Sequence, residues 1–229
     1  MERHFDEELK KLKNDLLKMA ALTEQAIHKS IEALKSQDRK MAMKVIEEDT
    51  QIDQIELVIE EEAIEMLALR EPKAKDLRFI TTGMKLNAEL ERIADLAVNV
   101  AQRVLDLEEN KPLLKPLIDI PKLSFLAQRM VKDAIDSFVN SDSELAKKVI
   151  LSDSEADKLR NSVCAELIND YLVKDGGDAP RAIPLLLIAR HLERICDHAT
   201  YMSQDIIYMI KAKVVKHHPE KLGGNNSKK

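Results

Sequence analysis

Eight acidic side chains at helical spacing are the residues of this sequence best suited to carry chemistry. They form four pairs in which the two acids stand four residues apart, so each pair lies on one face of a helix. Carboxylates that converge repel one another unless protons or cations compensate their charge. Oxygen-only ligands suit Mg, Ca, Mn or oxidised iron. We therefore predict carboxylate metal sites, and the eight predicted ligands are Asp49, Asp53, Glu91, Asp95, Asp153, Asp157, Glu193 and Asp197.

An internal repeat carries these acids. An offset of 104 residues aligns 31–53 with 135–157 without a gap, and eight of the 23 positions are identical. An offset of 102 aligns 90–97 with 192–199, where six of eight positions are identical. Similar amphipathic helices alone seldom match this well, so the match indicates two related halves. Because surface charge can drift between duplicated halves, the retention of an acid at all eight positions favours a shared role.

Helices must position the acids, because apolar residues recur at spacings of three and four. Gly and Pro, which destabilise helix interiors, occur at few points, and neither occurs in 1–71. Pro112, Pro116 and Pro121 interrupt the middle of the chain. We expect an all-α fold with helices over about 9–34, 42–71, 73–109, 121–140, 143–174 and 179–213.

The predicted domain organisation follows these interruptions. We expect a first three-helix repeat at 1–110 and a second at 122–215. A Pro-rich linker at 111–121 joins them, and 216–229 is expected to be a flexible tail because it contains little apolar material.

The turns predict which acids lie side by side. Helices joined by a short turn run antiparallel, so residues equidistant from the turn become neighbours. Asp49 and Asp95 are each 23 residues from Pro72, and Asp53 and Glu91 are each 19 residues from it. The second half repeats this relation about residue 175, which pairs position 153 with 197 and position 157 with 193. Each half is therefore expected to gather four carboxylates at one level of a helical hairpin.

The composition excludes several classes of protein. Charged residues make up 34% of the chain and aromatic residues 3%, with a net charge of -5, so a basic nucleic-acid surface is not expected. No apolar run is long enough to span a bilayer, and the N-terminus lacks a hydrophobic signal region. Cys164 and Cys196 stand outside any CxxC pattern. We expect a cytoplasmic helical protein without a transmembrane segment, and long amphipathic helices make a homodimer plausible.

Other interpretations of the polar residues remain open. The acids could be solvated surface groups that pair with the recurring cations Arg92, Arg194, Lys44 and Lys148. Histidines are weaker ligand candidates, because none stands three residues after an acid of the motif; they are His191, His198, His217 and His218. Asn99 continues the acidic stripe in the first half and could orient a ligand or bind water. Tyr201 takes the corresponding place in the second half, where its phenol could contribute a ligand oxygen or cap the cluster from solvent.

The segments Glu91–Asn99 and Glu193–Thr200, set in a duplicated three-helix pattern, closely resemble the PhoU family of phosphate-signalling proteins. The double E-x-x-x-D hallmark of that family is matched in both halves. Residues 45–49, 76–78 and the linker at 111–117 are also similar, so the resemblance covers about residues 5–215.

The resemblance implies two tandem three-helix bundles of long antiparallel helices, related by internal pseudo-symmetry. It also implies metal-cluster sites, with iron as the expected metal and Zn, Mn, Mg or Ca as alternatives. Glu91, Asp95, Glu193 and Asp197 occupy the hallmark positions. Asp49, Asp53, Asp153 and Asp157 are the partner acids on the preceding helices.

By the same resemblance, the expected function is that of a regulatory adaptor and not an enzyme. Such an adaptor represses the phosphate-starvation response and phosphate uptake. Its expected partners are the ATPase of a phosphate ABC transporter and a sensor histidine kinase, through which it associates peripherally with the membrane.

The second motif departs from the family pattern, because Tyr201 and Gln204 replace an Asn and an acid. Ala94 and Cys196 stand where the family usually has Gly. Three alternatives to the adaptor are a carboxylate-bridged oxidase or phosphohydrolase, an accessory protein of another phosphate transporter, and a structural helical spacer without metal.

Overall fold

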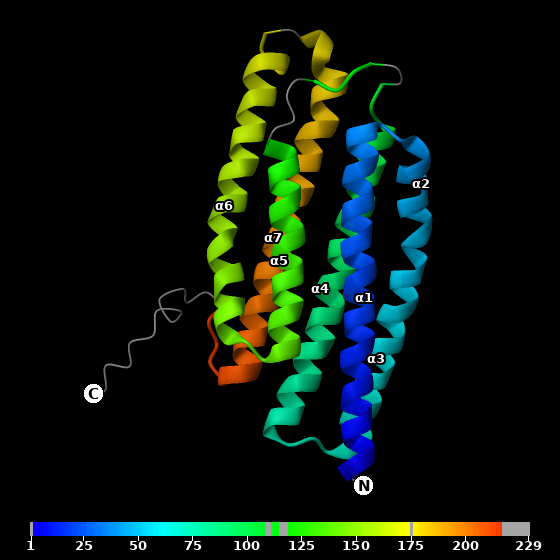
Figure 1. The fold of residues 1–229 in the computed structure, drawn as a ribbon, viewed down its shortest axis with the longest axis vertical. Coiled ribbons are helices and arrows are strands. Elements are labelled where there is room, and N and C mark those ends of the chain that lie inside the picture. Colours follow the sequence, from blue (N-terminus) through cyan, green and yellow to red (C-terminus); the bar gives the residue numbers. More distant parts are fainter. Residues whose placement is uncertain (1, 109–110, 115–118, 175, 217–229) are drawn as a thin grey trace, which may run out of the picture.

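The computed structural model describes residues 2–108, 111–114, 119–174 and 176–216 (Figure 1). These residues form α-helices and no strand, which confirms the predicted all-α class. The predicted tail lies outside the described residues except for residue 216, as do positions 115–118 of the predicted linker. The α-helices are α1 (Glu2–Ser36), α2 (Arg39–Glu48), α3 (Thr50–Arg70), α4 (Ala74–Leu105), α5 (Asp119–Asn140), α6 (Ser143–Leu167) and α7 (Ala179–Lys211).

Each half of the chain is a three-helix bundle whose helices run along the long axis of the molecule (Figure 1). The first bundle consists of α1, the α2–α3 pair and α4, and the second of α5, α6 and α7. Helix α4 packs along α7, and α1 packs against α5, so the two bundles lie side by side. Buried residues from both bundles form one continuous hydrophobic core.

Specific contacts join the two bundles besides the shared core. Phe79 of α4 stacks on Phe138 of α5, with ring centroids 5.1 Å apart. Arg78 Nε donates to the carbonyl of Met209 at 3.1 Å. Lys85 forms an ion pair with Asp205 at 2.7 Å. The hydrogen bond and the ion pair fix the register of the α4–α7 packing, and the stacked rings join α4 to α5.

Three predicted helices differ from the observed ones, and the helix expected to reach residue 109 ends at Leu105. The second predicted helix is divided into α2 and α3 at Asp49, where Ile52 N donates to the carbonyl of Asp49 at 2.8 Å in a tightened turn. The helix expected to reach residue 174 is α-helical only to Leu167 and continues as a π-helical turn, η1 (Ile168–Leu172), before a 3-10 turn, η2 (Gly176–Asp178).

Prolines mark the helix starts less strictly than expected. Helix α5 begins at Asp119, two residues before Pro121, because a first helical turn needs no backbone donor. Helix α7 continues through the buried Pro184. No helix among the described residues is long and apolar enough to cross a membrane.

Asp38 and Asp142, a pair of identical residues in the repeat, cap the N-termini of α2 and α6. Asp38 accepts hydrogen bonds from the backbone N–H groups of Lys40 and Met41, and Asp142 does the same for Glu144 and Leu145. Their retention in both halves therefore has a structural explanation.

Replacing either cap residue with alanine tests this role. We expect Asp38→Ala and Asp142→Ala each to lower the free energy of unfolding by about 1 kcal/mol, because two backbone donors lose their acceptor. Urea unfolding followed by circular dichroism measures the change. Asp38→Asn is the control, since it keeps the acceptor oxygen, and an equal loss in that variant would contradict the capping explanation.

Candidate functional site

The hairpin of α3 and α4 brings together the first four predicted acids. Glu71 ends α3 in the left-handed conformation, with φ 46°, and α4 starts three residues later. Asn87 Nδ2 donates to the carbonyl of Glu56 at 2.9 Å. A turn centred on Pro72 would place Asn87 opposite position 57, so the observed pairing of the two helices lies within one residue of the predicted pairing. The side-by-side placement of the two helices is therefore the one expected, and it defines the first acidic cluster of Asp49, Asp53, Glu91 and Asp95.

The acids of the first acidic cluster lie close enough to raise one another's pKa. Burial, with the nearby charges of Asp53 and Asp95, raises the pKa of Asp49 to about 6. The pKa of Glu91 is also raised, first by burial and then by Asp95, Glu56 and Asp53. Glu56, which the sequence analysis did not select, thus lies beside the cluster as a fifth acid.

The hairpin of α6 and α7 brings together the second acidic cluster, made of Asp153, Asp157, Glu193 and Asp197. Burial and the charges of the other three acids raise the pKa of Asp197 to about 6. Burial also raises the pKa of Asp153, while a hydrogen bond from Thr200 Oγ1 at 3.2 Å opposes that change. Each predicted group of four therefore lies along one hairpin, where like charges raise the pKa of some of its members.

The recurring cations do not neutralise the first acidic cluster. Arg92 pairs with Glu89 at 2.9 Å, and Lys44 lies 3.6 Å from Glu48. No described Lys, Arg or His forms an ion pair with any acid of the first cluster. In the first half, therefore, Arg92 and Lys44 form their ion pairs with other acids and not with the predicted ligands.

The second acidic cluster does contain a cation, which the sequence analysis missed. Arg160 Nη2 lies 3.2 Å from Glu193 Oε1 and 3.6 Å from Asp157 Oδ1. The signal that could have found it is the repeat itself, because the offset of 104 places Arg160 opposite Glu56.

The histidines lie outside the two clusters or are already engaged. His198 Nδ1 donates to Glu89 Oε2 at 2.5 Å, and its ring meets Tyr201 edge-on with centroids 5.8 Å apart. Burial and the neighbouring charges of Arg103, Arg194 and Arg190 lower the pKa of His191 to about 4. The two remaining candidates, His217 and His218, lie outside the described residues.

Tyr201 borders the second acidic cluster, as its place on the stripe predicts. Burial and the charge of Asp197 raise the pKa of its phenol. The residue is 41% exposed, so the phenol lies near the acids and is open to solvent. Lys216 Nζ lies 5.8 Å from the centroid of the same ring.

The donor chemistry of the first acidic cluster fits a hard cation. Its ligands are all carboxylate oxygens, and burial raises the pKa of two of them. No described side chain forms an ion pair with them, and the charge of Arg92 only partly opposes the rise in the pKa of Glu91. In the described part of the chain, no three His, Cys, Asp or Glu side chains converge closely enough to hold one ion. Binding a metal would therefore require these carboxylates to rotate toward one another.

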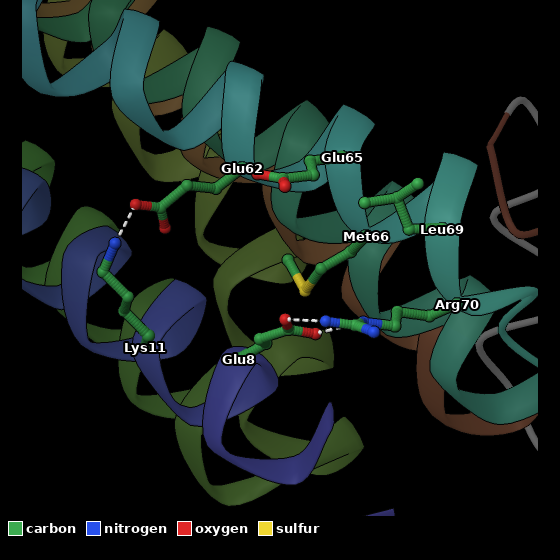
Figure 2. A pocket seen from close by; sticks show the side chains of 7 residues that line it. All are labelled: Glu8, Lys11, Glu62, Glu65, Met66, Leu69 and Arg70. Carbon is green, nitrogen blue, oxygen red and sulfur yellow. Dashed lines mark hydrogen bonds and ion pairs between the residues drawn. The ribbon is translucent and has the colours of Figure 1, made fainter. Parts of the chain in front are cut away.

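A separate cleft lies near the N-terminal end of the molecule, between α1 and α3 (Figure 2). Arg70 makes two hydrogen bonds to Glu8 across it, at 2.9 and 2.6 Å, and Lys11 pairs with Glu62. These charges satisfy one another, so the cleft is a salt-bridged seam and not a continuation of either acidic cluster.

The raised pKa of Asp49 predicts how the stability of the metal-free protein depends on pH. An acid with a higher pKa in the folded state binds more protons when folded, so its contribution to stability falls as pH rises from 3.8 to about 6. We expect Asp49→Asn, which resembles the protonated acid, to stabilise the chelator-treated protein by about 1 kcal/mol at pH 7.5, after allowance for solvent screening. That gain should disappear near pH 4.

Urea unfolding at a series of pH values measures this difference. Glu47→Gln, an exposed acid of α2, is the matched control and should change stability little. A gain in Asp49→Asn that stays constant between pH 4 and pH 7.5 would contradict the account of the first acidic cluster.

The comparisons with known proteins agree with this architecture. The family model described as "PhoU domain" matches residues 16–104 and again residues 120–206. The starts of the two matches differ by 104 residues and their ends by 102, which are the two offsets of the internal repeat.

Relatives match along almost the whole chain. The phosphate-specific transport system accessory protein PhoU homolog of Aquifex aeolicus is 40% identical over 210 residues, which cover 92% of this chain and 94% of that protein. The crystal structure of PhoU from Pseudomonas aeruginosa is 33% identical, with a TM-score of 0.87 over 91% of this chain and 100% of that one.

A second solved structure leads to the same assignment. The phosphate transport system regulatory protein PhoU from Streptococcus pneumoniae is 27% identical, with a TM-score of 0.85 over 92% of this chain and 99% of that one. The duplicated helical hairpins, the two acidic clusters and these matches lead to one conclusion: the chain belongs to the PhoU family.

Proposed function

We propose that this chain is a cytoplasmic regulatory adaptor that restrains phosphate uptake and phosphate-starvation signalling. In this role it couples the ATPase of a phosphate ABC transporter to a sensor histidine kinase, and its acidic clusters hold metal ions. The observation that carries the proposal is the match to the PhoU domain in both halves of the chain. The names of the relatives, an accessory protein and a regulatory protein of phosphate transport, support the same role.

The acidic clusters supply the proposed metal-binding part of the function. The four carboxylates of the first cluster repel one another, and none of them forms an ion pair with a described side chain. A hard cation would remove that repulsion and, once bound, would present open coordination positions to oxygen ligands. Asp49, Asp53, Glu91 and Asp95 would hold it.

The helical surfaces supply the proposed docking function. Helix α3 exposes four apolar side chains, of which Leu57 and Val58 follow Asp53 by about one turn and Ile64 and Leu69 lie nearer the end of the helix. Apolar side chains next to a charged stripe are the composition that docks onto another protein. A carboxylate stripe also favours partner surfaces rich in Arg and Lys. The homodimer expected from the long helices stays a prediction.

The names of the relatives favour the adaptor over the alternative of a carboxylate-bridged oxidase or phosphohydrolase. The accessory role at a different phosphate transporter remains a close variant of the same function. It would change the identity of the ATPase without changing the docking surfaces.

Metal content tests the first part of the proposal. We expect untagged protein, purified without chelators, to contain stoichiometric metal by inductively coupled plasma mass spectrometry. A variant with Ala at Glu91, Asp95, Glu193 and Asp197 should lose it, because each cluster loses two of its four oxygen donors. The matched control replaces four exposed acids outside the clusters, Glu47, Glu61, Glu155 and Asp170. Metal-free wild type, or equal metal in both variants, would contradict the proposed sites.

Partner binding tests the second part. We expect the wild-type chain to retain the transporter ATPase and the cytoplasmic region of the kinase in a pull-down. The variant with the four hallmark acids replaced should lose at least tenfold in affinity, whereas the four-acid control should bind normally. Unchanged binding by the hallmark variant would rule out docking through the acids or their metals.

A further inference from the structure

The two acidic clusters are equivalent in the repeat but differ at one position. The offset of 104 residues that pairs Asp53 with Asp157 places Glu56 opposite Arg160. Each of these two residues stands three positions after its acid, on the same side of its helix. The five matched positions therefore hold five acids in the first half, and four acids with one arginine in the second, giving formal charges of -5 and -3.

Arg160 is engaged with the acids of the second cluster. Its Nη2 lies 3.2 Å from Oε1 of Glu193 on α7 and 3.6 Å from Oδ1 of Asp157 on α6, so the guanidinium joins the two helices. Glu193, a hallmark acid, has only 15% of its side chain exposed. A guanidinium keeps its charge at every physiological pH, so it permanently offsets one of the four negative charges of the second cluster.

A second contact also satisfies the second cluster internally. Thr200 Oγ1 donates to Asp153 Oδ1 at 3.2 Å. The offset of 102 places Val98 opposite Thr200, and valine has no hydroxyl to donate. The second cluster thus has both a cation and a hydroxyl donor supplied by its own helices.

The first cluster has the opposite surroundings. Glu56 adds a carboxylate next to Asp53 and Glu91 instead of a positive charge. No described cation forms an ion pair with Glu56 or with the four acids of the cluster. An incoming metal ion would meet five oxygen-bearing acids here, whereas in the second cluster it would meet the charge of Arg160.

From these contacts we infer that Arg160 takes the place of a metal ion in the second acidic cluster, so that the first acidic cluster is the principal cation site of the chain. The inference rests on the proposed function, because it presumes that the carboxylates bind metal. It goes further by making the two halves unequal. The first cluster binds an exchangeable cation, whereas the cation of the second cluster is the covalently attached side chain of Arg160.

Exchanging the two charges tests the inference. Mn²⁺ is the probe, added to chelator-treated full-length protein, with bound and free ion measured by electron paramagnetic resonance and isothermal titration calorimetry. Wild type should bind Mn²⁺ mainly at the first cluster, so Asp49→Ala with Asp53→Ala should remove most of the binding. Asp153→Ala with Asp157→Ala should remove little.

The reciprocal substitutions should move the site. Glu56→Arg should weaken Mn²⁺ binding at least tenfold, because it copies the second cluster into the first half. Arg160→Glu should create additional bound Mn²⁺ with at least tenfold higher affinity at the second cluster, and Arg160→Gln should give a smaller gain. Lys148→Glu makes the same charge change on an exposed position of α6 and should leave binding unchanged.

Circular dichroism first establishes that each variant folds. If the added repulsion prevents Arg160→Glu from folding, Arg160→Gln replaces it in the Mn²⁺ measurements. Equal losses from the two alanine pairs, or no gain in either Arg160 variant, would overturn the inference while leaving metal binding by the clusters intact. Absence of Mn²⁺ from wild type and from both Arg160 variants would overturn the inference together with the metal-binding part of the proposed function. The partner pull-down tests the adaptor role separately.

Discussion

Repulsion between carboxylates held side by side is the constraint on which the rest of the molecule depends. Each bundle contains a hairpin that places acids of one helix near acids of the next, and Asp49 and Asp197 are half-buried there. Such an arrangement opposes folding, because burial and like charge both disfavour the ionised groups. The apolar packing of the two bundles must offset that cost, and the shared core between α4 and α7 supplies it.

The two halves resolve the repulsion differently, although they descend from one pattern. In the second half, Arg160 and Thr200 bring a positive charge and a hydroxyl donor to the acids. In the first half, Glu56 increases the negative charge, and the described residues offer no ion pair in return. The fold is therefore nearly symmetric while its electrostatics are not.

The hairpin register was predictable because it depends on local features. Turn residues such as Pro72 fix where the chain reverses, and helix geometry then determines which acids become neighbours. The repeat and the absence of Gly and Pro from the first 71 residues likewise predicted the helices. The division at Asp49 was not predictable, because a tightened turn with helical dihedral angles leaves the apolar spacing unchanged.

The contacts between the two halves also could not be predicted from the sequence. The hydrogen bond from His198 to Glu89 joins α7 to α4, and nothing in the spacing of either helix shows that these faces meet. Arg160 is an intermediate case. Its sequence position within the repeat was visible, but its role follows only from the geometry that brings Glu193 to it across the hairpin.

Anomalous diffraction from crystals grown with Mn²⁺ tests the central claim most directly, because it locates the cation without any substitution. The account predicts a strong anomalous peak at the first acidic cluster, and at the second cluster the guanidinium of Arg160 with a weak peak or none. A strong peak at the second cluster alone, or carboxylates of the first cluster surrounded only by water at saturating Mn²⁺, would contradict it.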